Sequence, residues 1–225
     1  MCGRYTFTRT TDAGAVVYPE GISINANPRY NIAPTQYAPV IPMDDPLHTY
    51  YFRWGLIPHW AKDVSIGIKM INARAETLGE KPAFREPLRR SRCLVPADGF
   101  YEWKKTASGK QPYRITLQPE SVFSFAGISD EWVSPEGNRI FSFSIITTEP
   151  NELMADIHDR MPVILSGEAE KKWLDPRTDV SEVITLLKPY NPFRMKAYPV
   201  SPQVGNVRAD HAGLIQPYAP PALLF

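Results

Sequence analysis

Alternation of apolar and polar side chains is the clearest pattern in this chain, and it predicts many short β-strands. The stretch GRYTFT at residues 3–8 alternates with period two, which is typical of a half-buried strand. Six further runs are rich in β-branched or aromatic residues and end in turns, so they also predict strands. These runs lie at residues 48–55, 100–105, 112–117, 122–128, 141–147 and 160–166.

Helical signals are fewer, and each is short. The candidates are EPNELMADI at 149–157, SGEAEKKWL at 166–174 and DVSEVITLLK at 179–188. The last two begin with a serine or aspartate suited to capping a helix. Strands and helices together predict an α+β fold, namely a curved antiparallel sheet or distorted β-barrel with short peripheral helices.

Composition supports one globular domain. The chain has 225 residues, of which 43% are hydrophobic and 22% are charged, as in ordinary globular proteins. Its 23 prolines break helix interiors and so favour short strands and defined loops. Without an internal repeat or a Gly/Ser linker, the sequence predicts a single domain at 1–217 and an extended tail at 218–225.

Cysteine content and hydropathy predict a cytoplasmic protein. Two cysteines, Cys2 and Cys93, are too few for a disulfide scaffold. No secretory signal follows Met1, and the apolar runs are far too short to span a membrane. We therefore expect a reducing compartment, no membrane association and a monomer, because no heptad or interface stripe is present.

Charge is balanced overall but uneven along the chain. The net charge is +1, yet the segment 69–114 carries a clear excess of lysine and arginine over acidic residues. Trp54 and Trp60 lie close in sequence to this segment, which includes Arg85, Arg89, Arg90 and Arg92. Proteins that bind single-stranded nucleic acid stack its bases on aromatic rings and pair its phosphates with cations. Two alternatives remain: the basic residues cluster by chance on a solvated surface, and the tryptophans belong to the core.

Cys2 becomes the N-terminal residue when Met1 is removed, as is common before a small side chain. Its α-amine then titrates near pKa ~8 and its thiol near about 8.5. An aldehyde can form an imine with this amine, and the thiol can close a thiazolidine ring. The alternative is that Cys2 is a small residue at the start of a strand.

Three more residues could assist such chemistry. Asn72, in a turn after the apolar stretch 66–71, can orient a polar group. Glu102 lies on the face of its strand opposite Trp103, where partial burial would raise its pKa. His158, between two aspartates, could move a proton. Each has an alternative: a turn cap, an exposed glutamate and a solvent-facing histidine. The remaining histidines show no metal-ligand spacing, so we expect neither a metal nor a cofactor.

Seven blocks along the chain together resemble the SOS-response-associated peptidase (SRAP) family of abasic-site-shielding proteins. They are MCGRY, RYNIAPTQ, RWGLIPHWAKD, INARAET, SRCLVPADGFYEW, DIHDRMPVIL and VSPQVGNV, which run in order to about residue 207. The resemblance implies lyase-like crosslinking of the protein to abasic sites in single-stranded DNA. It also implies a role in the DNA damage response, with the protein acting at a bacterial nucleoid.

The resemblance further implies roles for four site residues. The Cys2 amine would attack the open-ring aldehyde and its sulfur would close the thiazolidine. Asn72 would position the sugar or the N-terminus, and Glu102 would be the acid/base beside the amine. His158 would donate the proton that opens the sugar ring.

Four other residues resemble DNA contacts of the family. Arg4 and Arg74 would bind phosphates, since a guanidinium pairs well with phosphate oxygens. Trp60 and Trp103 would wall or stack the DNA path.

Three other functions are compatible with parts of this pattern. Class II glutamine amidotransferases also begin with MCG, but they need an Asn-Gly motif that this chain lacks. A thiol peptidase or autopeptidase, as the family name suggests, could use Cys2, Glu102 and His158. A non-covalent reader of modified or damaged DNA would need no reaction at Cys2.

Overall fold

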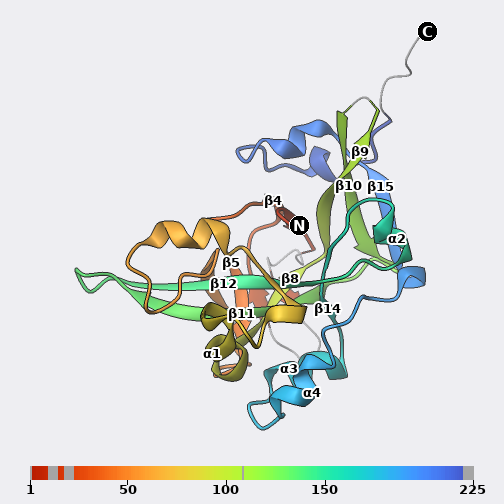
Figure 1. Ribbon diagram of the computed structural model, residues 1–225. Coiled ribbons are helices and arrows are strands. Elements are labelled where there is room, and N and C mark those ends of the chain that lie inside the picture. The colour runs from red at the N-terminus through yellow and green to blue at the C-terminus, as the bar shows by residue number, and fades with distance from the viewer. Residues whose placement is uncertain (1, 10–14, 18–22, 108, 220–225) are drawn as a thin grey trace.

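The computed structural model describes residues 2–9, 15–17, 23–107 and 109–219, which form two main sheets with short helices around them (Figure 1). The first sheet is antiparallel and has five strands. In order they are β15 (Met195–Pro199), β10 (Gly109–Leu117), β9 (Gly99–Thr106), β1 (Tyr5–Phe7) and β4 (Arg29–Ile32).

The second sheet contains a closed barrel. Its eight strands are β13 (Met161–Pro162), β12 (Arg139–Thr148), β6 (Tyr50–Trp54), β5 (Tyr37–Pro42), β8 (Arg92–Ala97), β11 (Phe123–Val133), β14 (Ile164–Leu165) and, beside β12, β7 (Asn72–Arg74). Because β12 pairs with both β6 and β11, the ring β12-β6-β5-β8-β11 closes on itself. Strand β12 runs parallel to β6 and β7, and the other pairings are antiparallel.

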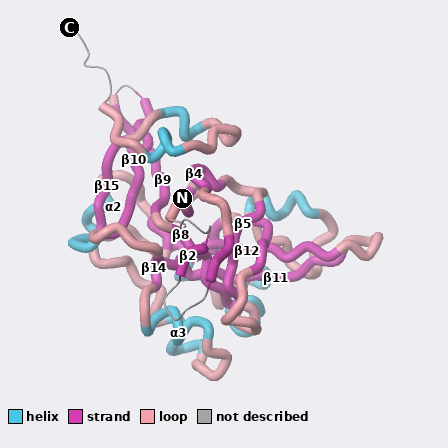
Figure 2. Tube along the Cα trace, turned by 180° about the vertical axis from the view of Figure 1, so that it is seen from behind, coloured by secondary structure: helices cyan, strands magenta, loops and turns pink. Residues whose placement is uncertain are grey.

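Short elements lie outside the two sheets (Figure 2). Strand β2 (Ala15–Val17) pairs antiparallel with β3 (Ser23–Asn25). The α-helices are α1 (Pro82–Arg90), α2 (Glu152–Ala155), α3 (Glu168–Leu174) and α4 (Val180–Ile184). The 3₁₀ helices are η1 (Val64–Lys69), η2 (Ala75–Thr77), η3 (Pro192–Arg194), η4 (Pro202–Gly205) and η5 (Ala212–Ile215). None of the helices in these described ranges is long and apolar enough to cross a membrane.

The predicted fold class, α+β with a distorted barrel and short peripheral helices, is confirmed. All seven predicted strand regions contain strands, but 160–166 is split into β13 and β14, which pair with different partners. The three predicted helices are present and shorter than expected, and α1 was not predicted. The single-domain boundary at 217 stays a prediction, and residues 220–225 of the predicted tail lie outside the described part.

The segment before Asn72 differs from the prediction. Residues 66–71 belong mostly to η1, and Asn72–Arg74 is itself a strand rather than a turn. Gly55 explains the difference, because its φ of +116° and the lack of a Cβ let the carbonyl of Gly67 approach closely. This contact fixes η1 against the end of β6, and the chain then enters β7.

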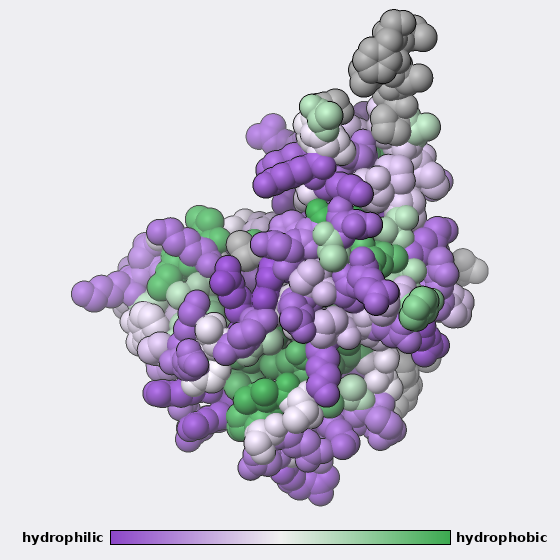
Figure 3. All heavy atoms as spheres, turned by 45° about the vertical axis from the view of Figure 1, so that its right-hand side comes forward, coloured by the Kyte–Doolittle hydropathy of each residue, from purple (hydrophilic) through white to green (hydrophobic). Residues whose placement is uncertain are grey.

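Aromatic rings join the two sheets. Tyr5 of β1 packs edge-on against Trp54, with ring centroids 5.2 Å apart, and against Phe125 at 5.7 Å. A smaller cluster around Tyr101 packs the C-terminal segment onto the other side of β9. On the face seen in Figure 3 most side chains are hydrophilic, with hydrophobic ones gathered in a patch low on that face. The N-terminal strand β1 thus lies between β9 and β4 in the five-stranded sheet and packs through Tyr5 against the barrel.

Candidate active site

Strand β1 places Cys2 inside the protein. The backbone N–H of Tyr101 donates to the Arg4 carbonyl at 3.0 Å, which aligns the start of β1 with β9. The Cys2 side chain is 0% exposed. Burial raises the pKa of the Cys2 thiol far above its usual range, and the nearby Glu102 carboxyl raises it further. The thiol is therefore neutral at physiological pH, and its side chain is shielded from solvent.

Glu102 comes from β9 and faces the same interior. Alternation along the strand separates it from Tyr101 and Trp103, which pack in the smaller cluster on the opposite face. Glu102 is 2% exposed, and burial raises the pKa of its carboxyl from 4.5 to about 7. The predicted elevation of this pKa is found, and the alternative of an exposed glutamate is wrong. A carboxyl with a pKa near 7 can both take and give a proton at neutral pH.

His158 lies in the loop between α2 and β13, and β13 pairs with β12 at the end of this loop. Its Nε2 is 4.0 Å from Oε2 of Glu102. The backbone N–H of Arg160 donates to Nδ1 at 3.0 Å, so the neutral ring carries its hydrogen on Nε2, on the side of Glu102. Asp159 Oδ1 also lies 2.9 Å from Nδ1, but its side chain is 88% exposed. Burial lowers the pKa of His158, so the neutral ring is favoured.

Asn72 reaches Cys2 from β7. Its Nδ2 donates to the Cys2 carbonyl at 2.9 Å. The indole of Trp54 holds the entry to β7 through a 2.9 Å bond to the Ile71 carbonyl, so Trp54 is a core residue rather than a DNA contact. Asn72 Oδ1 is buried, and among the described residues no group donates to it. An unsatisfied buried acceptor is costly, so this oxygen is suited to a hydrogen-bond donor that enters the site.

An ion pair that the sequence did not predict connects the His158 loop to β7. The guanidinium of Arg160 binds both carboxylate oxygens of Glu76, at 2.7 and 2.9 Å, and the carbonyl of Thr147 at 2.6 Å. Glu76 follows β7 directly in η2. The two partners are 84 residues apart, so no local pattern in the sequence signals the pair. This ion pair therefore links the loop that carries His158 to the segment that follows the strand of Asn72.

Of the two predicted phosphate contacts, Arg4 lies just before β1 and Arg74 lies on β7. Arg4 follows Cys2 in the N-terminal segment, where its Nη1 donates to the Gly3 carbonyl at 2.9 Å. Arg74 is exposed on β7, and period-two alternation puts it on the same side as Asn72. Both guanidinium groups are therefore placed near the elements that carry the reactive residues.

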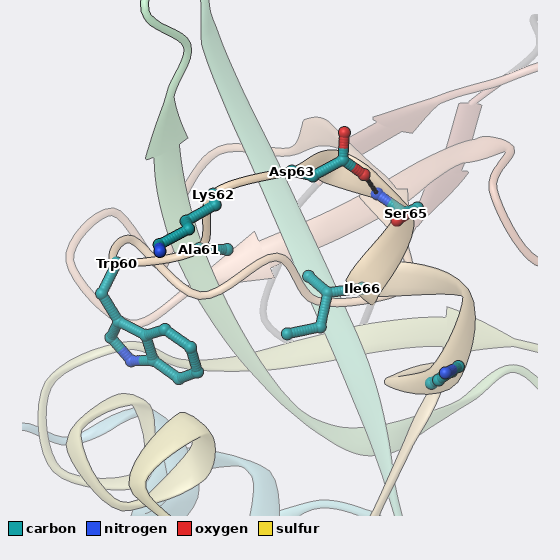
Figure 4. Close-up of a pocket in the computed structure, with 7 residues that line it drawn as sticks. Trp60, Ala61, Lys62, Asp63, Ser65 and Ile66 are labelled. Atoms are coloured by element: carbon teal, nitrogen blue, oxygen red, sulfur yellow. Dashed lines mark hydrogen bonds between the residues drawn. The ribbon is translucent and has the colours of Figure 1, made fainter.

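The two predicted DNA-contacting tryptophans lie apart from this cluster. Trp60 is 51% exposed and lines a shallow hollow (Figure 4). The other lining residues are Ala61, Lys62, Asp63, Ser65, Ile66 and Lys69. Trp103 is half-buried against Tyr101, on the face of β9 opposite Glu102. The structure therefore brings Cys2 and its polar neighbours together, and it puts the aromatic candidates on separate surfaces.

The position of Arg92 differs from the prediction that it belongs to a basic surface. Its side chain is buried and donates from Nε to the Trp173 carbonyl at 2.6 Å and from Nη2 to the Asp175 carbonyl at 2.7 Å. These bonds attach α3 to β8. Arg92 is thus a structural residue and is not available to DNA, whereas the other arginines of that segment, Arg85, Arg89 and Arg90, are exposed on α1.

The fold and the site define a class of protein: an α+β barrel whose second residue is a buried cysteine beside a carboxyl, an imidazole and an amide. The chain belongs to the family described as SOS response associated peptidase (SRAP), whose model matches residues 1–207. The resemblance seen in the sequence is thereby confirmed.

Several relatives carry names that refer to abasic sites. The abasic site processing protein YoqW of Bacillus subtilis (strain 168) is 48% identical over 225 residues, covering 96% of this chain and 99% of its own. The abasic site processing protein HMCES of Rattus norvegicus is 33% identical, covering 84% of this chain and 65% of its own. A crystal structure of a Bacteroides thetaiotaomicron protein has a TM-score of 0.79 at 36% identity, covering 84% of this chain and 85% of its own.

Proposed function

We propose that this protein processes abasic sites by forming a covalent thiazolidine crosslink between Cys2, after removal of Met1, and abasic sites in single-stranded DNA. The names of its relatives support abasic sites as the substrate. The observation that carries the chemistry is the grouping of Cys2 with Glu102, whose pKa is about 7, and with Asn72, which binds the Cys2 carbonyl. Met1 itself lies outside the described residues.

The first stage opens the sugar and forms an imine. His158 takes up a proton and, as the imidazolium, donates its Nε2 proton to the ring oxygen as the C1′–O bond breaks, which leaves the ring neutral. The C1′ hydroxyl proton passes to the Glu102 carboxylate. The Cys2 amine then attacks the aldehyde carbon, and a proton moves from nitrogen to Glu102 or His158. The carbinolamine hydroxyl is protonated and leaves as water. Asn72 Oδ1 supplies an acceptor for the N–H groups of the amine or for a sugar hydroxyl.

The second stage closes the ring. The Cys2 sulfur adds to the imine carbon, the π electron pair moves to nitrogen, and nitrogen takes up a proton. The thiol proton goes to Glu102, because the buried thiol is neutral and needs a base. Overall one water is released, and the reactive aldehyde is masked against strand cleavage by β-elimination.

The same neutral thiol argues against the peptidase alternative. Thiol peptidases attack amides with a thiolate, which an adjacent cation or base normally stabilises. At Cys2 both burial and the neighbouring carboxyl act in the opposite direction and raise the pKa. An amine that attacks first needs no thiolate, so the environment of Cys2 favours the crosslinking reaction.

We propose that DNA lies across the surface next to the site. Arg4 and Arg74 would hold phosphates beside the abasic sugar. Trp60 would stack a base in its hollow beside Lys62, since exposed aromatic rings with nearby cations bind single strands without sequence preference. Trp103 would contact DNA only on the face of β9 opposite Glu102. Monomeric state and action at the nucleoid remain predictions of the sequence.

The test incubates protein lacking Met1 with a single-stranded oligonucleotide that bears one abasic site, followed by denaturing electrophoresis. The wild type is expected to give a protein-DNA band without any reductant. Cys2→Ala keeps an N-terminal amine but lacks sulfur, so its band should require borohydride, which traps the imine. A wild type that gives no band sinks the proposal, as does a Cys2→Ala band of equal strength without borohydride.

A further inference from the structure

Asp98 is a buried carboxylate that the proposed chemistry does not use. We infer that Asp98, together with Thr6 and Arg114, forms a positioning cluster that fixes where Cys2 lies in the site. This inference rests on the proposed function and adds residues that act on Cys2 through strand β1. None of the three is a catalytic residue, because they lie at the far end of β1 from Cys2.

The Asp98 carboxylate gathers donors from the end of β1 and the residues after it. Its Oδ1 accepts the hydroxyl of Thr6 at 2.5 Å. Its Oδ2 accepts the backbone N–H and the hydroxyl of Thr8 at 2.7 and 2.6 Å, and the backbone N–H of Arg9 at 3.0 Å. Asp98 is 2% exposed, so these bonds are shielded from water. One side chain therefore clamps the N-terminal segment over residues 6–9.

Arg114 completes the cluster from β10. Its Nη2 lies 3.4 Å from Asp98 Oδ1, and both side chains are almost fully buried. The same Nη2 donates to the Thr6 hydroxyl at 3.1 Å, and Nη1 donates to the Tyr198 hydroxyl at 2.9 Å. A Cβ at position 99 would lie 2.9 Å from Arg114 Nε, so Gly99 leaves the room that the guanidinium occupies. Asp98 thus supplies the carboxylate of this ion pair, and the neighbouring Gly99 leaves the space for its guanidinium.

The cluster is connected to Cys2 through rigid backbone. Asp98 N–H donates to the Thr6 carbonyl at 2.9 Å, and the next bond along the pairing joins Tyr101 N–H to the Arg4 carbonyl. At the opposite end Asn72 binds the Cys2 carbonyl. The strand is held at both ends, so a shift at Thr6 is passed along β1 to Cys2.

Stability alone does not explain the ion pair. Replacing a buried ion pair by well-packed apolar residues is often neutral or stabilising, because the desolvation of two charges offsets their attraction. A network of directional hydrogen bonds instead fixes the positions of the groups that it joins. Reacting groups that are misplaced by about 1 Å can react ~100-fold more slowly. The cost of burying Asp98 and Arg114 is therefore better explained by placement of the nucleophile.

Thr6 offers the cleanest test. Thr6→Val keeps the branched shape suited to a strand and removes the hydroxyl that Asp98 and Arg114 both bind. Thr6→Ser keeps that hydroxyl and serves as the conservative rescue. Arg9→Ala is the matched control from the same segment, because the exposed Arg9 side chain pairs only with Glu120 in the described contacts. Asp98→Asn leaves Arg114 as a buried unpaired charge, so it reports mainly on folding.

Two measurements distinguish an effect on the position of Cys2 from an effect on DNA binding. The first is the first-order rate constant of crosslinking at saturating abasic oligonucleotide. The second is the affinity for an oligonucleotide with an unreactive tetrahydrofuran site, measured by fluorescence anisotropy. Thr6→Val is expected to lower the rate constant about tenfold with affinity unchanged within about twofold, while Thr6→Ser and Arg9→Ala retain the wild-type rate. Urea unfolding confirms that each variant is folded at the assay temperature.

A Thr6→Val variant that crosslinks at the wild-type rate overturns the inference, as does equal slowing by Thr6→Ser. If the wild type forms no crosslink, the proposed function fails, and positioning is judged by carbon-13 NMR titration of Glu102. A displaced Cys2 changes the burial of that carboxyl, so its titration midpoint should shift in Thr6→Val and stay unchanged in Thr6→Ser. An unchanged midpoint in Thr6→Val refutes the positioning cluster independently of DNA.

Discussion

Replacement of Glu102 by glutamine should stabilise the protein at high pH and have little effect at low pH. The pKa of this carboxyl is 4.5 in the reference state and about 7 in the folded protein, because burial disfavours its charged form. Between these values the folded state binds more protons than the unfolded state. The stability that neutral Glu102 confers is therefore complete below pH ~4.5 and is lost as pH rises through ~7.

The magnitude follows from the size of the shift. A change from 4.5 to about 7 corresponds to about 3 kcal/mol of unfolding free energy once the carboxyl is ionised in both states. Glutamine has a similar shape and carries no charge at any pH. Glu102→Gln should thus exceed the wild type in stability by about 3 kcal/mol at pH 8, and by less than about 1 kcal/mol at pH 5.

Urea unfolding at pH 5, 6, 7 and 8 measures this difference directly, provided that the m-values of the two proteins agree. Glu149→Gln is the control, because Glu149 is exposed at the end of β12 and surface substitutions change stability by less than about 0.5 kcal/mol. The same Glu102→Gln variant should crosslink slowly, since it lacks the proton acceptor. A stability difference that is absent, or that does not grow with pH, would refute the raised pKa and with it the proposed role of Glu102.

Three further outcomes are expected. Asn72→Ala should slow crosslinking about tenfold or more, measured on denaturing gels, because Cys2 loses the bond that holds its carbonyl. Arg92→Ala should lower the unfolding free energy in urea by about 3 kcal/mol, since three buried carbonyls lose their donor, while DNA affinity stays unchanged. Trp60→Ala should weaken binding to single-stranded DNA by about 1 kcal/mol or more in anisotropy titrations, with little change in stability. An unchanged affinity would show that DNA does not bind in the hollow beside Trp60.

Much of the architecture could be predicted from sequence because the strands alternate so regularly. Period-two patterning located β1 and put Glu102 on the face opposite Trp103, and runs of β-branched and aromatic residues located β9 and β12, as the structure confirms. The turn at Asn72 was predicted wrongly, since Asn72 lies in β7 and short apolar runs such as 66–71 do not reveal by periodicity what structure they or their neighbours adopt. The conformation of this run depends on the contact between Gly55 and Gly67, which only the folded chain reveals.

The supporting contacts of the site could not be predicted, because they join residues far apart in the chain. Arg160 and Glu76 are separated by 84 residues, and Thr6 and Asp98 by 92. Arg92 shows the reverse error, since a basic residue in a basic segment looked exposed but ties α3 to β8. Composition indicates that charges exist, and only the fold determines which of them are buried and paired.

The mass of the intact crosslinked species tests the covalent reaction at the N-terminal Cys2 most directly. Protein and abasic oligonucleotide are allowed to react without reductant, and the denatured product is analysed by mass spectrometry. We predict the mass of the chain lacking Met1 plus that of the oligonucleotide, less one water, with fragmentation assigning the adduct to Cys2. An adduct that retains Met1, or one that maps to another residue, would contradict this chemistry.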